Sequence, residues 1–395
     1  MTSVHAERSP KGGVEAGRLT PVRTPFDSGL LRRPPLRVNG GVIAALLLLA
    51  ACGNDLVIGV ERQIQVRAAV VDPATGDLLQ AGSRRGDLWY ARVKPDGSIV
   101  REQRVDFEGG EDAVNAVVVM PSGWAVAGYA TRADGRRTAW VRVLDTSDGE
   151  VWTKTYDQNG GWEAQGLAVD PVGTLVVTGT EAAGHGFVQR LDETGGVRWK
   201  YSTNTDLQGM VTNLRIFSAA TIGQSVQRVV TAGERAFSDG VKPELSQWSL
   251  MGDFYDSLRL DMSPGTSRGL LLDLDEATVC TQRGDDVVVR RSKWIKVPEV
   301  RHVVLHVDGA KLELGGCAPA SDGDMLVGAT AVFSDGRRVA RAAKVERTAA
   351  SIRWEKDVSA PDTVTVAGVA ADATGGGYLY GHTEEPLRRW TAKIL

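Results

Sequence analysis

From residue 63 to the end of the chain, apolar and polar residues alternate in short runs. The cleanest stretch is 164–199, where the runs QGLAV, TLVVTG and GFVQRL are followed by VRW and separated by turn sequences such as DPVG and DETGG. Alternation with a period of two, interrupted by Asp, Pro and Gly, predicts antiparallel strands joined by tight turns and not helices. The stretch therefore predicts a four-stranded meander.

A glycine near the end of the second run of each unit gives the period of the repeat. These glycines are Gly82, Gly128, Gly179, Gly233, Gly328 and Gly381, spaced by 46, 51, 54, 95 and 53 residues. The gap of 95 equals two periods, which predicts a unit without the glycine around Cys280. We expect seven units over 63–108, 112–158, 163–206, 210–262, 267–309, 311–360 and 363–395. The segment 275–310 is the hardest to place, because it does not divide cleanly into runs.

Seven four-stranded units at this spacing predict an all-β chain folded as a seven-bladed β-propeller of four-stranded antiparallel blades. Third runs carry an aromatic residue followed three positions later by a base or an apolar residue, as in Trp89 to Arg92 and Phe187 to Arg190, and fourth runs carry tryptophans such as Trp152. We expect the tryptophans to pack between neighbouring sheets. The last unit ends in its third run, so we expect residues 55–61 to supply its fourth strand and cover the open edge.

These repeats resemble the bacterial SBBP-type propeller repeats, which are similar to the pyrroloquinoline-quinone repeat. The resemblance covers almost all of residues 63–395 and implies a secreted or lipid-anchored protein, but it specifies the fold better than the function. The regular Gly-Lys-x-x-Trp spacing of the quinone repeat is missing. We therefore expect no cofactor.

Residues 1–51 contain no alternating strands and end in the apolar run VIAALLLLAA, which is followed by Cys52. Ten apolar residues are too few to span a membrane but suit a signal peptide. The sequence Leu-Ala-Ala-Cys at 49–52 resembles the bacterial lipobox, which implies a lipid on Cys52. We expect a leader and lipoprotein signal peptide over 1–51, a lipid-anchored cysteine and closing strand over 52–62, and the propeller over 63–395.

The segment ahead of the apolar run is long for a signal peptide. Translation starting near Leu30 or Leu31 would leave a basic segment with Arg32 and Arg33. This arginine pair also suggests twin-arginine export, although the prolines that follow fit that pattern poorly. The location that follows is the bacterial cell envelope, with anchoring to the outer membrane favoured over the inner one.

Charge narrows the classes of partner. The whole chain has a net charge of −3, and residues 1–51 carry seven Lys or Arg against three Asp or Glu, so the remainder carries −7. This balance disfavours a nucleic-acid binder. Cys280 and Cys317 are a disulfide candidate if the protein enters an oxidising compartment. Two separately buried thiols remain the alternative, because nothing in the sequence fixes their distance.

No catalytic or metal-ligating set emerges from the sequence. His302 and His306 would lie about 13 Å apart along one strand, too far to share a metal. The segment 265–269 matches the G-x-S-x-G nucleophile motif, but strand-like residues follow where a helix is needed, so we expect a turn. The strings LDTSDG and ASDGD are similar to calcium loops, and we expect them to be turns as well. We expect no metal site.

Arginine pairs recur after the second run in four units. They are Arg84, Arg85, Arg136, Arg137, Arg337, Arg338, Arg388 and Arg389. Such pairs could form an arc that binds an anionic partner, since guanidinium groups engage carboxylate or phosphate bidentately. The alternative is that they neutralise acidic neighbours such as Glu111 and Glu163 on the same face.

We therefore expect a monomeric, non-enzymatic binding or scaffolding lipoprotein of the cell envelope, anchored to the membrane through Cys52. Its partner would be a protein or an anionic envelope component, or a ligand, held on the loop face or at the mouth of the channel. The alternative is a propeller enzyme, a hydrolase, lyase or quinoprotein-like protein, with its site at the channel mouth. Clustered carboxylates and histidines at that mouth would favour the enzyme, and a smooth apolar channel would favour binding.

Overall fold

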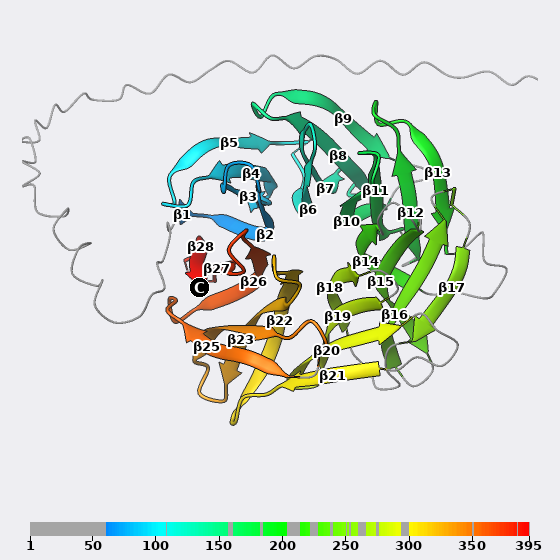
Figure 1. Cartoon of the computed structure of the whole chain (residues 1–395). Coiled ribbons are helices and arrows are strands. Elements are labelled where there is room, and N and C mark those ends of the chain that lie inside the picture. Colours follow the sequence, from blue (N-terminus) through cyan, green and yellow to red (C-terminus); the bar gives the residue numbers. More distant parts are fainter. Residues whose placement is uncertain are drawn as a thin grey trace, which may run out of the picture. The chain divides into compact units, whose positions relative to one another are not determined.

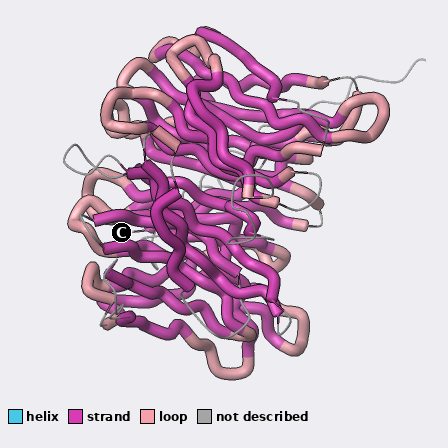
Figure 2. Tube along the Cα trace, turned by 90° about the vertical axis from the view of Figure 1, so that its right-hand side faces the viewer, coloured by secondary structure: helices cyan, strands magenta, loops and turns pink. Residues whose placement is uncertain are grey.

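The computed structural model describes residues 61–394 apart from gaps at 108, 157–160, 182–184, 204–213, 222–227, 238–239, 250, 253, 260–265, 274–275, 294–299, 350 and 385. Within this part of the chain there are 28 strands. Figure 2 shows strands and loops and no helix among these residues. The strands form seven four-stranded antiparallel sheets in sequence order. No helix long and apolar enough to cross a membrane occurs among these residues.

The sheets are numbered here in chain order. Sheet 1 contains β2 (Ile64–Val71), β3 (Leu78–Arg84), β4 (Asp87–Val93) and β5 (Ile99–Val105). Sheet 2 contains β6 (Ala113–Met120), β7 (Gly123–Thr131), β8 (Arg137–Asp145) and β9 (Glu150–Tyr156). Sheet 3 contains β10 (Glu163–Val169), β11 (Leu175–Thr180), β12 (Gly186–Leu191) and β13 (Val197–Ser202).

The second half of the chain repeats the arrangement. Sheet 4 contains β14 (Leu214–Thr221), β15 (Arg228–Phe237), β16 (Gly240–Ser249) and β17 (Phe254–Arg259). Sheet 5 contains β18 (Thr266–Asp273), β19 (Glu276–Arg283), β20 (Asp286–Lys293) and β21 (Val300–Leu305). Sheet 6 contains β22 (Ala310–Pro319), β23 (Met325–Phe333), β24 (Arg338–Val345) and β25 (Ile352–Val358). Sheet 7 contains β26 (Val364–Ala371), β27 (Gly377–Thr383), β28 (Arg388–Ile394) and β1 (Glu61–Arg62).

The sheets coincide with the units expected from the sequence, and β18 and β22 begin one residue before the expected boundaries. The last sheet takes its fourth strand from the beginning of the described chain. Glu61 pairs with Arg389, and Arg62 with Arg388. Residues 55–60 of the expected closing strand, and Cys52 with the leader, lie outside the described residues.

Neighbouring sheets pack face to face in chain order, and the seventh packs against the first (Figure 1). The first strand of every sheet contacts the first strands of the two adjoining sheets, so β2, β6, β10, β14, β18, β22 and β26 form a closed series of contacts. Strands in the middle of a sheet are buried on both faces, as in β3 and β4, whereas the fourth strands β5 and β9 are largely exposed. Burial therefore requires the neighbouring sheets, which explains why the alternation is weak in the middle strands.

The recurring glycine has a steric explanation. At Gly82, Gly128, Gly179 and Gly381, a Cβ atom would lie 1.9 to 2.0 Å from a backbone oxygen of the first strand. Each of these glycines pairs with the residue that immediately precedes a β-bulge in the first strand. Cys280 occupies this register in sheet 5, as expected. In sheet 6 the expectation for Gly328 is wrong by one residue, because Ala329 occupies the register and Gly328 pairs one position further along.

The base of the third-strand marker is held by an aspartate in the first turn of the same sheet. Examples are Arg92 with Asp72 at 2.8 Å, Arg190 with Asp170 at 2.6 Å and Lys344 with Asp322 at 2.6 Å. The aromatic member of the marker is fully buried, as at Trp89 and Trp140. The marker thus ties the third strand to the first turn while filling the space between sheets.

Tryptophans of the fourth strands pack across to the next sheet, as expected. The ring of Trp152 in sheet 2 lies 3.0 Å from the position that a Cβ atom of Gly195 in sheet 3 would occupy. Trp152 also donates its indole N–H to the Glu193 carbonyl at 3.0 Å. Trp199 covers Gly252 of sheet 4 in the same way, at 2.9 Å. The glycine in the turn leaves room for the indole ring.

A disulfide joins sheets 5 and 6. Cys280 of β19 is bonded to Cys317 of β22, with the two Cα atoms 6.4 Å apart. Of the two arrangements left open by the sequence, the paired one is therefore present. Disulfides are typical of proteins outside the reducing cytosol. The bond indicates an extracytoplasmic protein.

Candidate functional site

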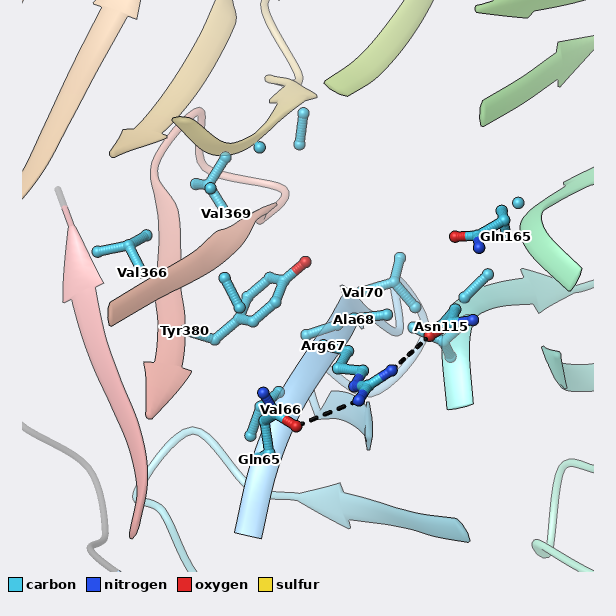
Figure 3. A pocket seen from close by; sticks show the side chains of 18 of the residues that line it. Gln65, Val66, Arg67, Ala68, Val70, Asn115, Gln165, Val366, Val369 and Tyr380 are labelled. Carbon is cyan, nitrogen blue, oxygen red and sulfur yellow. Dashed lines mark hydrogen bonds between the residues drawn. The ribbon is translucent and has the colours of Figure 1, made fainter. Parts of the chain in front are cut away.

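A cavity of about 910 Å³ lies between the first strands of the sheets (Figure 3). Its walls come mainly from β2, β6, β10, β22 and β26. The end of the cavity where these strands begin is polar. The end where they finish is apolar and is formed by residues such as Val70, Val117, Leu167 and Val369. The polar end is the candidate site.

The side chains that face this cavity are set by β-bulges. Each first strand has a bulge at the same register, opposite the position of the recurring glycine. A bulge redirects the side chain of its extra residue. The residues at the bulges of sheets 1 to 3 and 5 to 7 are Arg67, Asn115, Gln165, Gly269, Gly315 and Ala367. Large polar side chains thus come from sheets 1 to 3, and small residues from sheets 5 to 7.

Arg67, Asn115 and Gln165 are directed into the cavity from three consecutive sheets (Figure 3). Arg67 donates to the Asn115 side-chain oxygen at 3.1 Å and to the Gln65 side-chain oxygen at 3.3 Å. The amide nitrogen of Asn115 donates to the Ala164 carbonyl at 2.9 Å, which links sheet 2 to sheet 3. This polar group is therefore held in place by hydrogen bonds within and between sheets.

Two of the three carboxylates that line the polar end, those of Glu163 and Glu313, are paired with arginines. Arg137 forms an ion pair with Glu163 and stacks over the ring of Tyr129 at 4.1 Å. Glu313 accepts from Arg338 at 2.9 Å. The same guanidinium group donates to the Val364 carbonyl at 2.9 Å and the Thr365 hydroxyl at 3.0 Å of sheet 7. These pairs join adjoining sheets around the polar end.

His382 lines the same cavity and is 9% exposed. Burial lowers the pKa of His382 below its ordinary value, and the charges of Arg67 and Arg338 act in the same direction. The ring is therefore neutral at neutral pH. Its Nδ1 atom has no hydrogen-bond partner within the described part of the chain.

The eight arginines of the expected arc lie at the connections between second and third strands of sheets 6, 7, 1 and 2. This is the end of the sheets where the cavity is polar, because the first strands begin there. Several of the eight are engaged within the protein. Besides Arg137 and Arg338, Arg84 pairs with Glu102 at 2.9 Å. Arg389 is 1% exposed and donates to Gln80 of sheet 1 at 2.8 Å.

The remaining arginines of the arc are more accessible or make weaker contacts. Arg136 and Arg337 are exposed, lying 3.6 Å and 3.9 Å from the aspartates of their own turns. Arg85 donates to the Gln63 side chain, and Arg388 is half-buried. Internal pairing thus uses a large part of the charge that the sequence assigns to the arc.

Other residues singled out in the sequence lie away from the cavity. His306 contacts Asp286 at 2.7 Å on the outer part of sheet 5. The aspartates of the calcium-like strings cap turns, as Asp145 does by accepting from the Ser147 and Gly149 amides at 2.8 Å. The described residues contain no group of three His, Cys, Asp or Glu suited to a metal ion. The nucleophile-like match at 265–269 was expected to be a turn, but Thr266–Asp273 is strand β18, because these residues pair with β19.

Arg67, Asn115 and Gln165 were missed in the sequence because a bulge reverses the expected side-chain direction. Strict alternation would have placed them facing a neighbouring sheet. The recurring glycine is the signal that could have located them, since it lies opposite the residue before each bulge. The cavity itself required the positions of the first strands relative to one another.

No protein-family model matches the chain, and no curated protein sequence matches it. The fold and site therefore define the class of protein. It is an all-β protein built of seven successive antiparallel sheets, with a polar cavity between their first strands.

Proposed function

We propose that the chain is a seven-bladed β-propeller that acts as a non-enzymatic binding protein of the bacterial cell envelope. The fold part of the proposal is supported by the closed series of contacts among the seven sheets and by the pairing of β1 with β28. The functional part rests on one observation. Three consecutive bulges direct Arg67, Asn115 and Gln165 into one cavity of about 910 Å³, a size that suits a small ligand.

The polar end of the cavity has three carboxylates and a histidine, a feature that would favour an enzyme, but an enzymatic role has less support because two of the three carboxylates are paired with arginines. Hydrolysis of a glycosidic bond needs two carboxylates on either side of the scissile bond. Glu163 and Glu313 instead pair with Arg137 and Arg338. The cavity therefore offers groups suited to holding a polar molecule.

A substitution that fills the cavity with a large side chain tests the proposed binding site. In Gln165→Trp the indole ring occupies the space into which the glutamine side chain points, so we expect the protein to lose the ligands that it retains from cell-envelope extracts. Native mass spectrometry of the purified full chain measures this loss. The matched control is Val151→Trp, at a residue 56% exposed on the outer strand β9. Equal ligand retention by both variants would place binding outside the cavity.

Anchoring to a membrane through Cys52 is the second part of the proposal. It is supported by the lipobox-like sequence at 49–52 and by the disulfide, which suits an oxidising compartment. A lipid chain on this cysteine would hold the propeller at the membrane surface while the cavity binds its ligand. We favour the outer membrane over the inner membrane as the place where the protein is anchored.

The anchor is tested by expressing Cys52→Ala in a bacterial host supplied with an alkyne-tagged fatty acid. We expect the wild-type protein to carry the label and to sediment with membranes, and the variant to lose both properties. Cys317→Ala serves as the control for removing a cysteine and should keep the label. Labelling of Cys52→Ala would overturn the assignment.

A further inference from the structure

Arg67 differs from Arg137 and Arg338, which lie at the same end of the sheets, because its guanidinium group has no carboxylate partner among the described residues. Arg137 and Arg338 each have a carboxylate partner. Arg67 instead donates to two neutral amide oxygens, those of Asn115 and Gln65. Within the residues that the structure describes, no carboxylate lies within 4.0 Å of its guanidinium group. A partly buried cation without a counter-charge is stabilised by an anion that binds to it.

The glutamates that line the cavity restrict which anions can reach Arg67. Glu111, Glu163 and Glu313 all line the cavity. Glu163 and Glu313 are balanced by Arg137 and Arg338, so the charge of Glu111 is the one that repels a molecule with several negative groups, such as a polyphosphate. A ligand with a single negative group meets less repulsion and still gains the ion pair. The planar fork of the guanidinium group matches carboxylate and phosphate alike, and a carboxylate is favoured here because it carries a single negative charge.

The remaining polar groups suit a ligand rich in hydroxyls. The Asn115 and Gln165 side chains supply planar amides on one side of the space, and the Tyr380 hydroxyl points toward it from sheet 7 (Figure 3). Amide groups can donate to one hydroxyl and accept from another, so the set complements a sugar ring better than an apolar acid.

We propose that the polar end of the cavity binds a sugar acid, a polyhydroxylated molecule with one carboxylate, and that Arg67 pairs with that carboxylate. The inference rests on the proposed binding function and names its ligand class. Asn115 and Gln65 orient the guanidinium group, since both accept its N–H bonds. Gln165 then contacts the hydroxyl groups.

The test is calorimetric titration of the purified full chain with D-glucuronate, D-galacturonate, D-glucose and inorganic phosphate. We expect a uronate to bind at least about tenfold more tightly than glucose or phosphate, because only it satisfies both the arginine and the amides. Arg67→Gln should weaken uronate binding by at least about tenfold, since glutamine retains hydrogen bonding but no charge. Arg67→Lys should fall between the two, because it keeps the charge and loses the fork.

The control is Arg136→Gln, which removes an exposed arginine at the same end of the neighbouring sheet and outside the cavity lining. It should bind uronates as the wild type does, and all variants should share the wild-type melting temperature. Failure of both uronates to bind, equal binding of glucose, tighter binding of phosphate, or undiminished uronate binding by Arg67→Gln would each overturn the inference. Retention of envelope ligands by Arg67→Gln together with their loss in Gln165→Trp would leave the proposed function standing and reject the sugar acid.

Discussion

Replacing Arg190 by methionine is expected to lower the free energy of unfolding by about 3 to 5 kcal/mol, because it leaves a buried carboxylate without its counter-charge. The Asp170 side chain is completely buried and lies 2.6 Å from the Arg190 guanidinium group. Asp170 also accepts from the Thr174 amide at 2.9 Å and from the Val172 amide at 3.0 Å. The pair ties the third strand of sheet 3 to its first turn.

The matched control is Arg198→Met in the same sheet. Arg198 pairs with Glu193 at 3.2 Å, but their side chains are 46% and 76% exposed. An exposed pair contributes no more than about 1 kcal/mol. Urea unfolding of the wild type, Arg190→Met and Arg198→Met measures the free energy of unfolding that each substitution removes. Equal stability of the two variants would show that burial of the Asp170 pair has no energetic consequence.

Acid provides a second measurement on the same pair. Burial alone would raise the pKa of Asp170, but hydrogen bonds from Thr174 and Arg190 outweigh it and hold the pKa below its ordinary value. The stabilisation is therefore complete above the pKa of an unfolded aspartate, about 3.9, and is lost as the pH falls through the lower pKa of the folded protein. We expect the stability gap between the wild type and Arg190→Met to narrow below about pH 4. A gap that is independent of pH would contradict the ion pair.

Substitution of Gly128 by alanine is expected to destabilise the protein by about 3 kcal/mol, because the added methyl group overlaps the backbone of the neighbouring strand. The Cβ atom would lie 1.9 Å from the Ala113 carbonyl oxygen and 2.8 Å from the Val114 Cα atom. Backbone atoms in the middle of a sheet cannot move without breaking the hydrogen bonds of the ladder. Gly128 pairs with Val114, and the bulge at Asn115 comes immediately after Val114 in the strand. The Asn115 side chain should therefore also shift in the cavity.

Gly316→Ala is the control for this substitution. Gly316 is also in a strand, but its Cβ would have its nearest neighbour at 3.5 Å, an ordinary contact distance. Thermal unfolding of both variants should show a large fall in melting temperature for Gly128→Ala and a small change for Gly316→Ala. Similar melting temperatures would mean that the recurring glycine has no steric role.

The loss of binding expected for the cavity variants can be separated from these stability effects. Arg67 and Gln165 lie at bulges and face the cavity. Gly128 instead allows two strands to approach closely, and Arg190 pairs with the buried Asp170. A variant that loses ligand at an unchanged melting temperature reports on the site. One that loses both reports on the fold.

Local sequence accounts for the strands and their grouping because each sheet forms from consecutive segments. Turns such as 170–173 need only nearby residues, and Asp170 caps its own turn. The glycine period and the aromatic-base marker also lie within one unit. Seven units were therefore countable before any contact between units was known.

Contacts between units decide which charged side chains are buried or paired. These contacts join residues that are far apart in the chain. Arg389 is an ordinary member of an arginine pair in the sequence, yet it is buried against Gln80, which lies 309 residues away. Arg137 meets Glu163 because sheets 2 and 3 adjoin. The spacing of the arginines could not reveal this pairing, since it depends on packing between sheets.

By itself, the sequence determined the all-β class, the number of units and the approximate bounds of each unit, because alternation and turn residues act over a few positions. Only the tertiary structure decided that Cys280 and Cys317 pair, that Arg67, Asn115 and Gln165 face one cavity, and that much of the arginine arc is internally bonded. These features depend on strand register, on bulges and on the approach of separate sheets. Each of them is set by packing between segments that are distant in the chain.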